Sequence, residues 1–409
     1  MDPSVSPQSC HPSRPPHLQI PASSSTVDVR VIDTNTRLFL KPGLFYEPAL
    51  PRVEGPNAPV YCFLVSHGDR HVVFDLGVRT DWEAYAPRVV QLVKATTRVT
   101  SCERDVAAVL DDYYHASSSS SSNGGEDHHR AAHLLLPSSA EVEAVVWSHS
   151  HFDHAGDPSR FPAHTQLVVG PGVRAASWPG YPTNPDALVL DSDAAGRVVR
   201  EIKFREEEDG ATAGDGGDGP PPLQVAGFDA FDYFGDGSFY LLDAPGHAAG
   251  HMCALARTTA DPLSFVFMGA DACHHPGVLR PSQHLPLPRP AEGDGSSETQ
   301  EGEHQHLESH GGCFGDLLAR IAAWKKTSDE PFYHLPRGPM FLDHEAAVET
   351  VAKIQELDAA GNVLVLLAHD DSLHGHLPLF PERVNHWQSL GLREDTRWLF
   401  CKELEDFKP

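Results

Sequence analysis

Residues 149–154 read His-Ser-His-Phe-Asp-His and place four side chains that can bind metal within six positions. The hexapeptide follows the apolar run at 142–147, which predicts a buried strand that ends where the polar cluster begins. Loops at strand ends are held by a rigid sheet and often carry functional sites. The alternative is a histidine-rich surface loop, in a chain with 26 histidines. The strand exit favours a metal site.

Side-chain direction within the hexapeptide suggests how the ligands divide. If the segment is extended, His149 and His151 point the same way and can hold one ion together. Asp153 and His154 are adjacent and are expected to point apart. The cluster can therefore offer two ligands to one metal ion and two more to a second ion close by, as two-metal hydrolases need.

Three later segments repeat the pattern of an apolar run followed by a ligating side chain: 239–246 before His247, 264–270 before Asp271, and 363–368 before His369. Each run is typical of a buried strand. A single histidine after a strand is more often a hydrogen-bonded polar group than a ligand. Four matching segments in order favour one shared metal site.

On these residues the chain resembles the metallo-β-lactamase superfamily, whose signature is His-x-His-x-Asp-His followed by a distal His, a bridging Asp and a final His. The resemblance covers roughly residues 27–409 and includes Val-Phe-Asp-Leu-Gly at 73–77, where Asp75 would be a structural or supporting residue. It implies an α/β (α+β) fold, a four-layer αβ/βα sandwich with two mixed sheets between outer helices. The site is expected at one edge of the sandwich.

The resemblance also implies a two-metal centre with a defined ligand set. The first metal takes His149, His151 and His247, the second takes Asp153, His154 and His369, and Asp271 bridges both. Imidazole and carboxylate ligands fit zinc first, with two ions per chain, and also accept iron, manganese or cobalt.

Within the superfamily, the segments 245–251 and 368–370 resemble the quorum-quenching N-acyl-homoserine lactonase group. The true β-lactamases often place a cysteine at one metal position. The lactonase group opens a lactone ring with a metal-bridging hydroxide, assisted by a tyrosine three residues beyond the bridging Asp. That position is His274 here, which departs from the pattern. His274 is a candidate donor to the carbonyl or leaving oxygen, and the alternative is a surface-loop imidazole.

The ligand set predicts a metal-dependent hydrolase that acts on a small lactone or ester. Two ions would lower the pKa of a shared water and leave hydroxide as the nucleophile. Asp153 can take the nucleophile's proton and return it to the leaving group. One alternative is a thioester hydrolase that resembles glyoxalase II, and another is a non-catalytic binding protein in which the metals are structural.

The charge balance bears on partners. Lys and Arg total 31 against 57 Asp and Glu, which gives a formal net charge of −26. Such a chain repels polyanions, so we expect no nucleic-acid partner, and the nuclease branches of the superfamily are disfavoured. A small-molecule substrate is expected, and the sequence does not indicate an oligomeric state.

Seven scattered cysteines without a close Cys-x-x-Cys pair are typical of an intracellular protein. No run of 18 apolar residues predicts a membrane span, and the N-terminus lacks the pattern of a signal peptide. We therefore expect a cytoplasmic protein without membrane contact.

Pro- and Ser-rich residues 1–26 predict a disordered tail, and residues 27–409 a single domain. Low-complexity insertions are expected near 117–130, 206–222 and 286–312. Residues 59–65 and 71–74 predict a hairpin. Helices are expected at 314–326 and 344–357.

Overall fold

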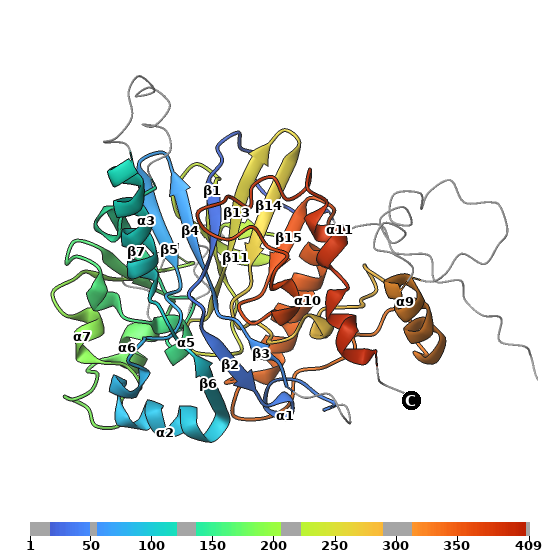
Figure 1. Cartoon of the computed structure of the whole chain (residues 1–409), viewed down its shortest axis with the longest axis horizontal. Helices are drawn as coiled ribbons and strands as arrows, with labels where there is room; N and C mark the ends of the chain where they lie inside the picture. Colours follow the sequence, from blue (N-terminus) through green and yellow to red (C-terminus); the bar gives the residue numbers. More distant parts are fainter. Residues whose placement is uncertain (1–16, 50–54, 121–135, 206–221, 289–312, 406–409) are drawn as a thin grey trace, which may run out of the picture.

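The computed structural model of the chain describes residues 17–49, 55–120, 136–205, 222–288 and 313–405. Within these ranges the strands form two six-stranded sheets and one three-stranded sheet (Figure 1). The first sheet contains β1 Asp28–Asp33, β4 Tyr61–His67, β5 Arg70–Phe74, β7 Val142–Val146, β8 Gln166–Val169 and β9 Val199–Glu201. The second contains β10 Gln224–Val225, β11 Phe228–Asp232, β12 Phe239–Asp243, β13 Met252–Ala260, β14 Leu263–Met268 and β15 Val363–Leu366. The small sheet contains β3 Asn57–Ala58, β2 Arg37–Leu40 and β6 Thr97–Ser101.

The main helices lie on the outer sides of the two large sheets (Figure 1). The α-helices are α1 Pro42–Phe45, α2 Pro87–Thr96, α3 Val106–Ser120, α5 Phe152–Ala155, α6 Val173–Ser177, α7 Asp191–Ala194, α9 Cys313–Trp324, α10 His344–Ala359 and α11 Leu392–Thr396. Short 3-10 helices are η1 Trp82–Ala84, η3 Ser139–Glu141, η4 Pro158–Arg160, η5 Pro276–Val278, η6 Asp371–Leu373 and η7 Leu399–Leu404. The two helices expected from the sequence are confirmed as α9 and α10.

Side-chain alternation along the strands builds the layers. In β4, Phe63 and Val65 enter a core between the two large sheets, whereas Leu64 enters a core beneath α3. In β15, Leu364 joins the core between the sheets and Val365 joins the core beneath α10. Because successive residues of a strand face opposite sides, strands apolar on both faces serve two cores at once. The result is the predicted helix–sheet–sheet–helix sandwich.

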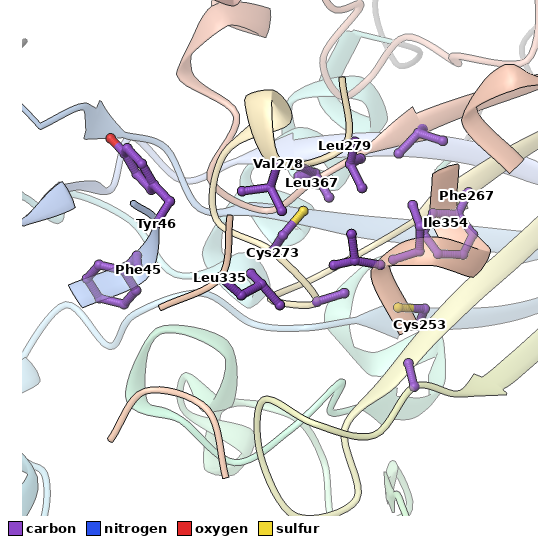
Figure 2. Packing of buried hydrophobic residues seen from close by; sticks show 14 of the residues in the cluster. Phe45, Tyr46, Cys253, Phe267, Cys273, Val278, Leu279, Leu335, Ile354 and Leu367 are labelled. Atoms are coloured by element: carbon purple, nitrogen blue, oxygen red, sulfur yellow. The ribbon is translucent and has the colours of Figure 1, made fainter. Parts of the chain in front are cut away.

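The core beneath α10 is the largest of the three. Figure 2 shows residues of this core, including Phe267 from β14 and Ile354 from α10. α10 begins where the Asp343 side chain accepts a hydrogen bond from the Ala346 amide, which satisfies one free donor of the first turn. Burial of its apolar stripe fixes α10 against the second sheet.

Both large sheets are mixed, as expected. β5, β7, β8 and β9 run parallel, and the β4–β5 pair forms the predicted antiparallel hairpin. In the second sheet, β14 pairs in parallel with β15, and β12 runs in the same direction because two antiparallel steps separate it from β14. The amide of Met252 donates to the Ser148 carbonyl at 2.8 Å and so joins the two sheets at their edge.

The prediction of a disordered tail over residues 1–26 is wrong for residues 17–26, which form an ordered segment, here called the strap. Leu18 and Ile20 of the strap pack against the core beneath α10. Arg257 of β13 donates to the carbonyl of Pro21 at 2.7 Å. The partly buried Leu18 and Ile20 and the Arg257 hydrogen bond therefore hold this segment against the domain, which composition alone did not indicate. Residues 1–16 lie outside the described ranges.

The low-complexity insertions fall mainly outside the described residues. Of the insertion expected near 117–130, the first part belongs to the end of α3. Most of 206–222 and 286–312 is not described. Among the described helices, none combines the length and apolar character needed to cross a bilayer.

Candidate metal centre

Five strands end at one edge of the sandwich and place polar side chains there. In the first sheet, β5 precedes Asp75 and β7 precedes the 149–154 hexapeptide. In the second sheet, β12, β14 and β15 precede His247, Asp271 and His369. Strands that run in the same direction bring their carboxyl ends to a common edge, so residues more than 200 positions apart meet.

The structure brings all seven predicted ligands together in two groups. One contains His149, His151, His247 and Asp271, and the other contains Asp153, His154, Asp271 and His369; within each group one ligating atom per residue lies within 4.8 Å of the others. Asp271 is the residue that both groups share. Its Oδ2 lies 3.4 Å from Nε2 of His247, and its Oδ1 lies 3.1 Å from Nε2 of His369.

The expectation that Asp153 and His154 point apart is wrong. The chain is extended only as far as His151 and then forms the helical turn α5 Phe152–Ala155. On this turn Nε2 of His154 lies 4.0 Å from Oδ2 of Asp153, so both side chains face the second group. The hexapeptide is still divided between the two groups, because the turn directs the later pair away from the earlier pair.

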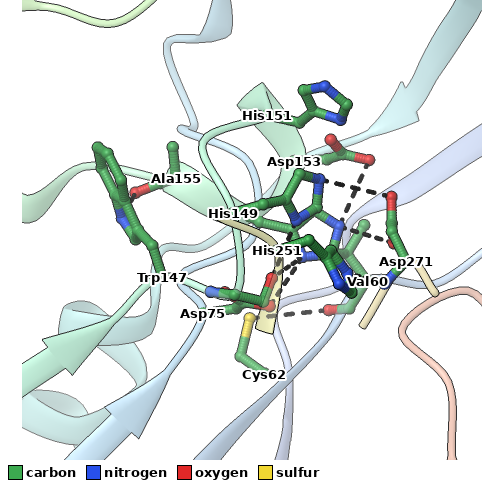
Figure 3. Close-up of polar contacts among 12 residues, drawn as sticks. Val60, Cys62, Asp75, Trp147, His149, His151, Asp153, Ala155, His251 and Asp271 are labelled. Atoms are coloured by element: carbon green, nitrogen blue, oxygen red, sulfur yellow. Dashed lines mark hydrogen bonds and ion pairs between the residues drawn. The ribbon is translucent and has the colours of Figure 1, made fainter. Parts of the chain in front are cut away.

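Several buried nitrogen and oxygen atoms of the cluster lack hydrogen-bond partners. Among the described residues of the two groups, these are Nδ1 of His247, Nε2 of His149, His154 and His369, and Oδ1 of Asp271. Oδ1 of Asp271 lies within ion-pair distance of two of these atoms, 3.0 Å from Nε2 of His154 and 3.1 Å from Nε2 of His369. Figure 3 shows His149, Asp153 and Asp271 directed toward one another. Unpaired buried polar atoms are costly in a folded protein, and a cation bound between them would satisfy their lone pairs. The residues present therefore fit a metal site.

The pKa shifts of the clustered histidines also fit a site for cations. Burial lowers the pKa of His149 well below its usual value, and His154 and His151 lower it further, so its ring is neutral. Burial also lowers the pKa of His369, but Asp271 and Asp153 outweigh it and raise the pKa to about 10. Likewise, Asp271 and Asp75 outweigh burial and raise the pKa of His154 well above its usual value. The protons thus supply positive charge that bound cations would replace.

Asp75 supports a histidine of each group, His154 directly and His149 through Ser148. Its Oδ2 lies 2.8 Å from Nδ1 of His154, and its Oδ1 accepts a hydrogen bond from the Ser148 amide at 2.7 Å. The Ser148 hydroxyl in turn lies 3.0 Å from Nδ1 of His149. A partner at Nδ1 turns Nε2 toward the centre and fixes the ring, which is how supporting residues tune metal sites. The supporting role expected for Asp75 agrees with these contacts.

His251 contributes a contact that the sequence analysis did not single out. Its Nδ1 donates to the Ala244 carbonyl at 2.9 Å, and its Nε2 accepts from the Asp271 amide at 3.3 Å. His251 is fully buried and is shown beside Asp271 in Figure 3. It fixes the backbone that carries the shared carboxylate. The available signal was a second histidine four residues after His247, directly before an apolar strand.

His274 is buried and lies inside the centre, which excludes the surface-loop interpretation. Its Nε2 is 3.0 Å from Oδ2 of Asp271, and its ring is stacked nearly parallel to His369, with an 8° interplanar angle and centroids 5.7 Å apart. The Phe45 ring also contacts that of His274, with ring centroids 4.5 Å apart. His274 therefore contacts the shared carboxylate at the point where the two groups meet.

Backbone conformation at the strand ends is unusual where the site requires it. Asp75 and Ala270 have φ values of 62° and 42°, which side-chain-bearing residues rarely adopt. Gly246 has φ 130°, and a Cβ there would lie 2.3 Å from Cα of Ala347 in α10. Only glycine allows this approach, through which the start of α10 positions the neighbouring His247.

A pocket of about 470 Å³ borders the centre at His369. Polar and apolar residues both line it: Gly55, Pro56, Asn57, His275, Pro276, His369, Asp370, Asp371, Ser372, His374, His376, Leu399, Phe400, Lys402 and Glu403. The volume is in the range of small-molecule sites. His275 and Pro276 of this wall come from the segment that follows the shared Asp271.

Comparison with known proteins agrees with this architecture. A family model described as the metallo-beta-lactamase superfamily matches residues 55–256. The chain is 53% identical over 399 residues to the metallo-hydrolase mfmC of Annulohypoxylon moriforme, covering 97% of this chain and 92% of that protein. It is 39% identical over 403 residues to the gamma-lactamase FDB1 of Fusarium pseudograminearum, covering 97% of this chain and 86% of that protein.

Among solved structures, an N-acyl homoserine lactone hydrolase with the product N-hexanoyl-L-homoserine at its catalytic metal centre is similar over 88% of this chain and 99% of its own, at 14% identity and a TM-score of 0.49. Three curated relatives are longer, and the chain spans 39% of their length. The chain belongs to the metallo-β-lactamase superfamily. It is a hydrolase of that superfamily with a candidate site for metal ions.

Proposed function

We propose that this protein is a hydrolase that uses two metal ions to open a small lactone or another carboxylic ester. The single observation that carries the proposal is Asp271, which belongs to both ligand groups and is 3% exposed. A carboxylate shared in this way would hold two ions close enough to act on one substrate bond. We propose zinc as the metal, with iron, manganese or cobalt also compatible with the ligands.

The protein residues would divide the remaining work. Bound metal ions would supply an acidified water and polarise the scissile carbonyl. Asp153 is the better placed of the two clustered carboxylates to hold and return a proton, because its side chain is 10% exposed, compared with 3% for Asp271. His274 is proposed as the donor to the carbonyl or leaving oxygen, since its Nε2 already lies at the meeting point of the two groups.

A cyclic amide is the second candidate substrate, and the likeness to the gamma-lactamase FDB1 over 97% of this chain favours it. Lactones and γ-lactams share a planar carbonyl in a small ring, so the same cluster could act on either. They differ in the leaving group, because an amine needs a proton more than an alkoxide does. The proton held by Asp153 therefore matters more for the lactam.

The test combines metal analysis with a substrate panel. Purified protein is analysed for bound metal and then assayed with acyl-homoserine lactones of several chain lengths, simple esters, γ-lactams and S-lactoylglutathione. Turnover of lactones or esters, lost after chelation and restored by zinc, supports the proposal. Preference for S-lactoylglutathione would favour a thioester hydrolase. Two bound metals with no turnover of any compound would instead favour the binding-protein alternative.

A further inference from the structure

A second polar cluster lines the pocket beside His369 and contains none of the seven candidate ligands. It is centred on Glu403 of η7, whose carboxylate contacts two residues from distant segments. Nε2 of His275 lies 3.2 Å from Oε2, and the Tyr333 hydroxyl donates to Oε1 at 2.7 Å. We call Glu403, His275 and Tyr333 the Glu403 cluster.

The hydrogen bonds define which atoms carry protons. The Gly277 amide donates to Nδ1 of His275 at 3.0 Å, so the ring proton resides on Nε2 and is donated to Glu403. Burial, together with the charge of Glu403, raises the pKa of Tyr333, so the phenol keeps the proton that it donates. Each carboxylate oxygen of Glu403 thus receives one donor. Because a carboxylate oxygen accepts about two hydrogen bonds, each retains capacity for another.

Neighbouring rings hold the cluster rigidly. The ring of His275 lies 4.7 Å from those of Tyr46 and Tyr333 and 5.7 Å from that of Phe400, measured between centroids. The side chain of His275 is 7% exposed, whereas that of Glu403 is 23% exposed. The donors are therefore buried while the acceptor opens into the pocket. This arrangement differs from a solvated surface acid, which no fixed partner would orient.

The cluster is tied to the metal centre through adjacent residues. His274 contacts Asp271, and the next residue, His275, contacts Glu403. Glu403 and His369 also line the same pocket of about 470 Å³. Pro276 and Phe400 add apolar wall to the same pocket, which suits a ring or short chain. A molecule whose carbonyl lies at the metal centre can therefore reach Glu403 with a second group.

We propose that Glu403 determines specificity by accepting a hydrogen bond from a donor group on the substrate, so the pocket takes lactones or esters that carry a hydroxyl or ammonium group away from the scissile bond. This inference rests on the proposed function and names its substrate class. A substrate that lacks the donor displaces water from the carboxylate without filling its remaining acceptor positions, and one with a carboxylate at that position is repelled. Glu403 is a binding residue in this scheme and takes no part in the chemical step.

The experiment compares Glu403→Gln with wild-type protein on matched lactones. Dihydrocoumarin is used unsubstituted and with a hydroxyl, methoxy, aminomethyl or carboxyl group at each ring position. With wild-type protein, we expect a hydroxyl or aminomethyl group at one position to lower KM about ten-fold relative to methoxy, as a hydrogen bond to a charged group allows. Glu403→Gln replaces a charged acceptor with a neutral amide, so it should reduce this preference several-fold, most for the aminomethyl group, while changing kcat less than about two-fold, since the chemistry is untouched. Which of the two donors gives the larger effect distinguishes neutral from cationic substrates.

The matched control is Glu405→Gln, which changes an exposed glutamate two residues away and should leave the preference intact. A merely structural role of Glu403 would raise KM or lower kcat equally for all substrates. That result, or a wild-type enzyme indifferent to the donor, overturns the inference. If no lactone or ester is turned over, the proposed function fails, and calorimetric binding of the ring-opened hydroxy and methoxy acids still tests Glu403. Equal affinity for the two acids then counts against it.

Discussion

His274 and His275 are neighbours in the chain, yet they belong to two different regions of the pocket. His274 contacts Asp271 in the metal cluster, whereas His275 contacts Glu403 in the pocket wall. His275 is extended, with φ −153° and ψ 130°, so consecutive side chains leave the backbone on opposite sides. One dipeptide thus serves the metal cluster, which we call the reactive region, and the Glu403 cluster, which we call the recognition region. We expect that the two can be altered separately.

The two regions also differ in how the fold supplies their residues. The metal cluster is built at the ends of regular strands, where hydrogen-bonded ladders fix each position. The Glu403 cluster comes from a loop after β14, the segment after α9 and the 3-10 helix η7. Loops vary more easily than sheets, so substrate preference can change while the chemistry is kept.

The largest effect is expected from Asp271→Asn. Losing the shared negative charge weakens both metal positions, so kcat/KM should fall on the order of 10³-fold and bound metal should drop below two per chain. Metal analysis and steady-state kinetics measure the two effects. The control is Asp329→Asn, at an exposed acid after α9. Full activity with two metals in Asp271→Asn would contradict the role given to the shared carboxylate.

Asp75→Asn is expected to act on metal affinity. The carboxylate holds the His154 ring and the Ser148 amide, and an amide side chain can accept from only one of them. Supporting residues of this kind typically change affinity or activity by about 10–100-fold. Competition with a chelator measures the affinity. Asp69→Asn, in the exposed turn between β4 and β5, should behave as wild type; an unchanged affinity in Asp75→Asn would separate Asp75 from the metal centre.

Tyr333→Phe should affect the recognition region alone. It removes the 2.7 Å hydrogen bond to Glu403 and leaves the ring packing in place. We expect KM for a donor-bearing lactone to rise by about ten-fold or less, with kcat and metal content unchanged. Kinetics and metal analysis on the same preparation check this. A loss of metal would show that the two regions are not separable.

The smallest effect is expected at Asp193 in α7, which belongs to neither region. Burial raises the pKa of Asp193 to about 7, so the folded protein keeps this proton up to about pH 7. The unfolded chain releases it near the usual pKa of 3.8. Stability should therefore fall as pH rises from about 4 to 7, and Asp193→Asn should remove this dependence. The variant keeps an oxygen for the Leu190 amide.

The free energy of unfolding of the variant, relative to that of the wild type, should be higher at pH 8 than at pH 5 by on the order of 1–2 kcal/mol. This corresponds to a few degrees in Tm. Thermal unfolding of both proteins at the two pH values measures the difference. Activity per bound metal should not change. A Tm difference that is independent of pH would mean that Asp193 is ionised in the folded protein.

The metal cluster could be predicted from the sequence because each of its residues follows a buried strand. An apolar run before His247, Asp271 or His369 both identifies the strand and places its end at the site edge. The four-layer arrangement was expected only through the family resemblance that these residues carry. The helical turn at 152–155 was not predicted, since four residues carry no periodic pattern, and so the directions of Asp153 and His154 were wrong.

The Glu403 cluster could not be predicted in this way. Glu403 is 128 residues from His275 and 70 from Tyr333, and each lies in a segment without regular periodicity. Their meeting depends on how the C-terminal segment packs across the second sheet, which no local pattern encodes. His251 was missed for a related reason: a buried histidine bonded to backbone groups looks the same in sequence as one packed in a core.

The strap has a practical consequence for recombinant protein. A chain shortened to begin at Val27 would retain every candidate ligand but would lose Pro21, whose carbonyl accepts a hydrogen bond from Arg257. Arg257 is only 2% exposed. The buried guanidinium would keep the Gly237 carbonyl as an acceptor for Nε but would lose the acceptor of one terminal nitrogen. That loss would loosen β13, which lies between β12 and β14, the strands that lead to His247 and Asp271. Poor metal retention in such a shortened protein would then reflect a missing N-terminal segment and could be mistaken for a poor ligand set.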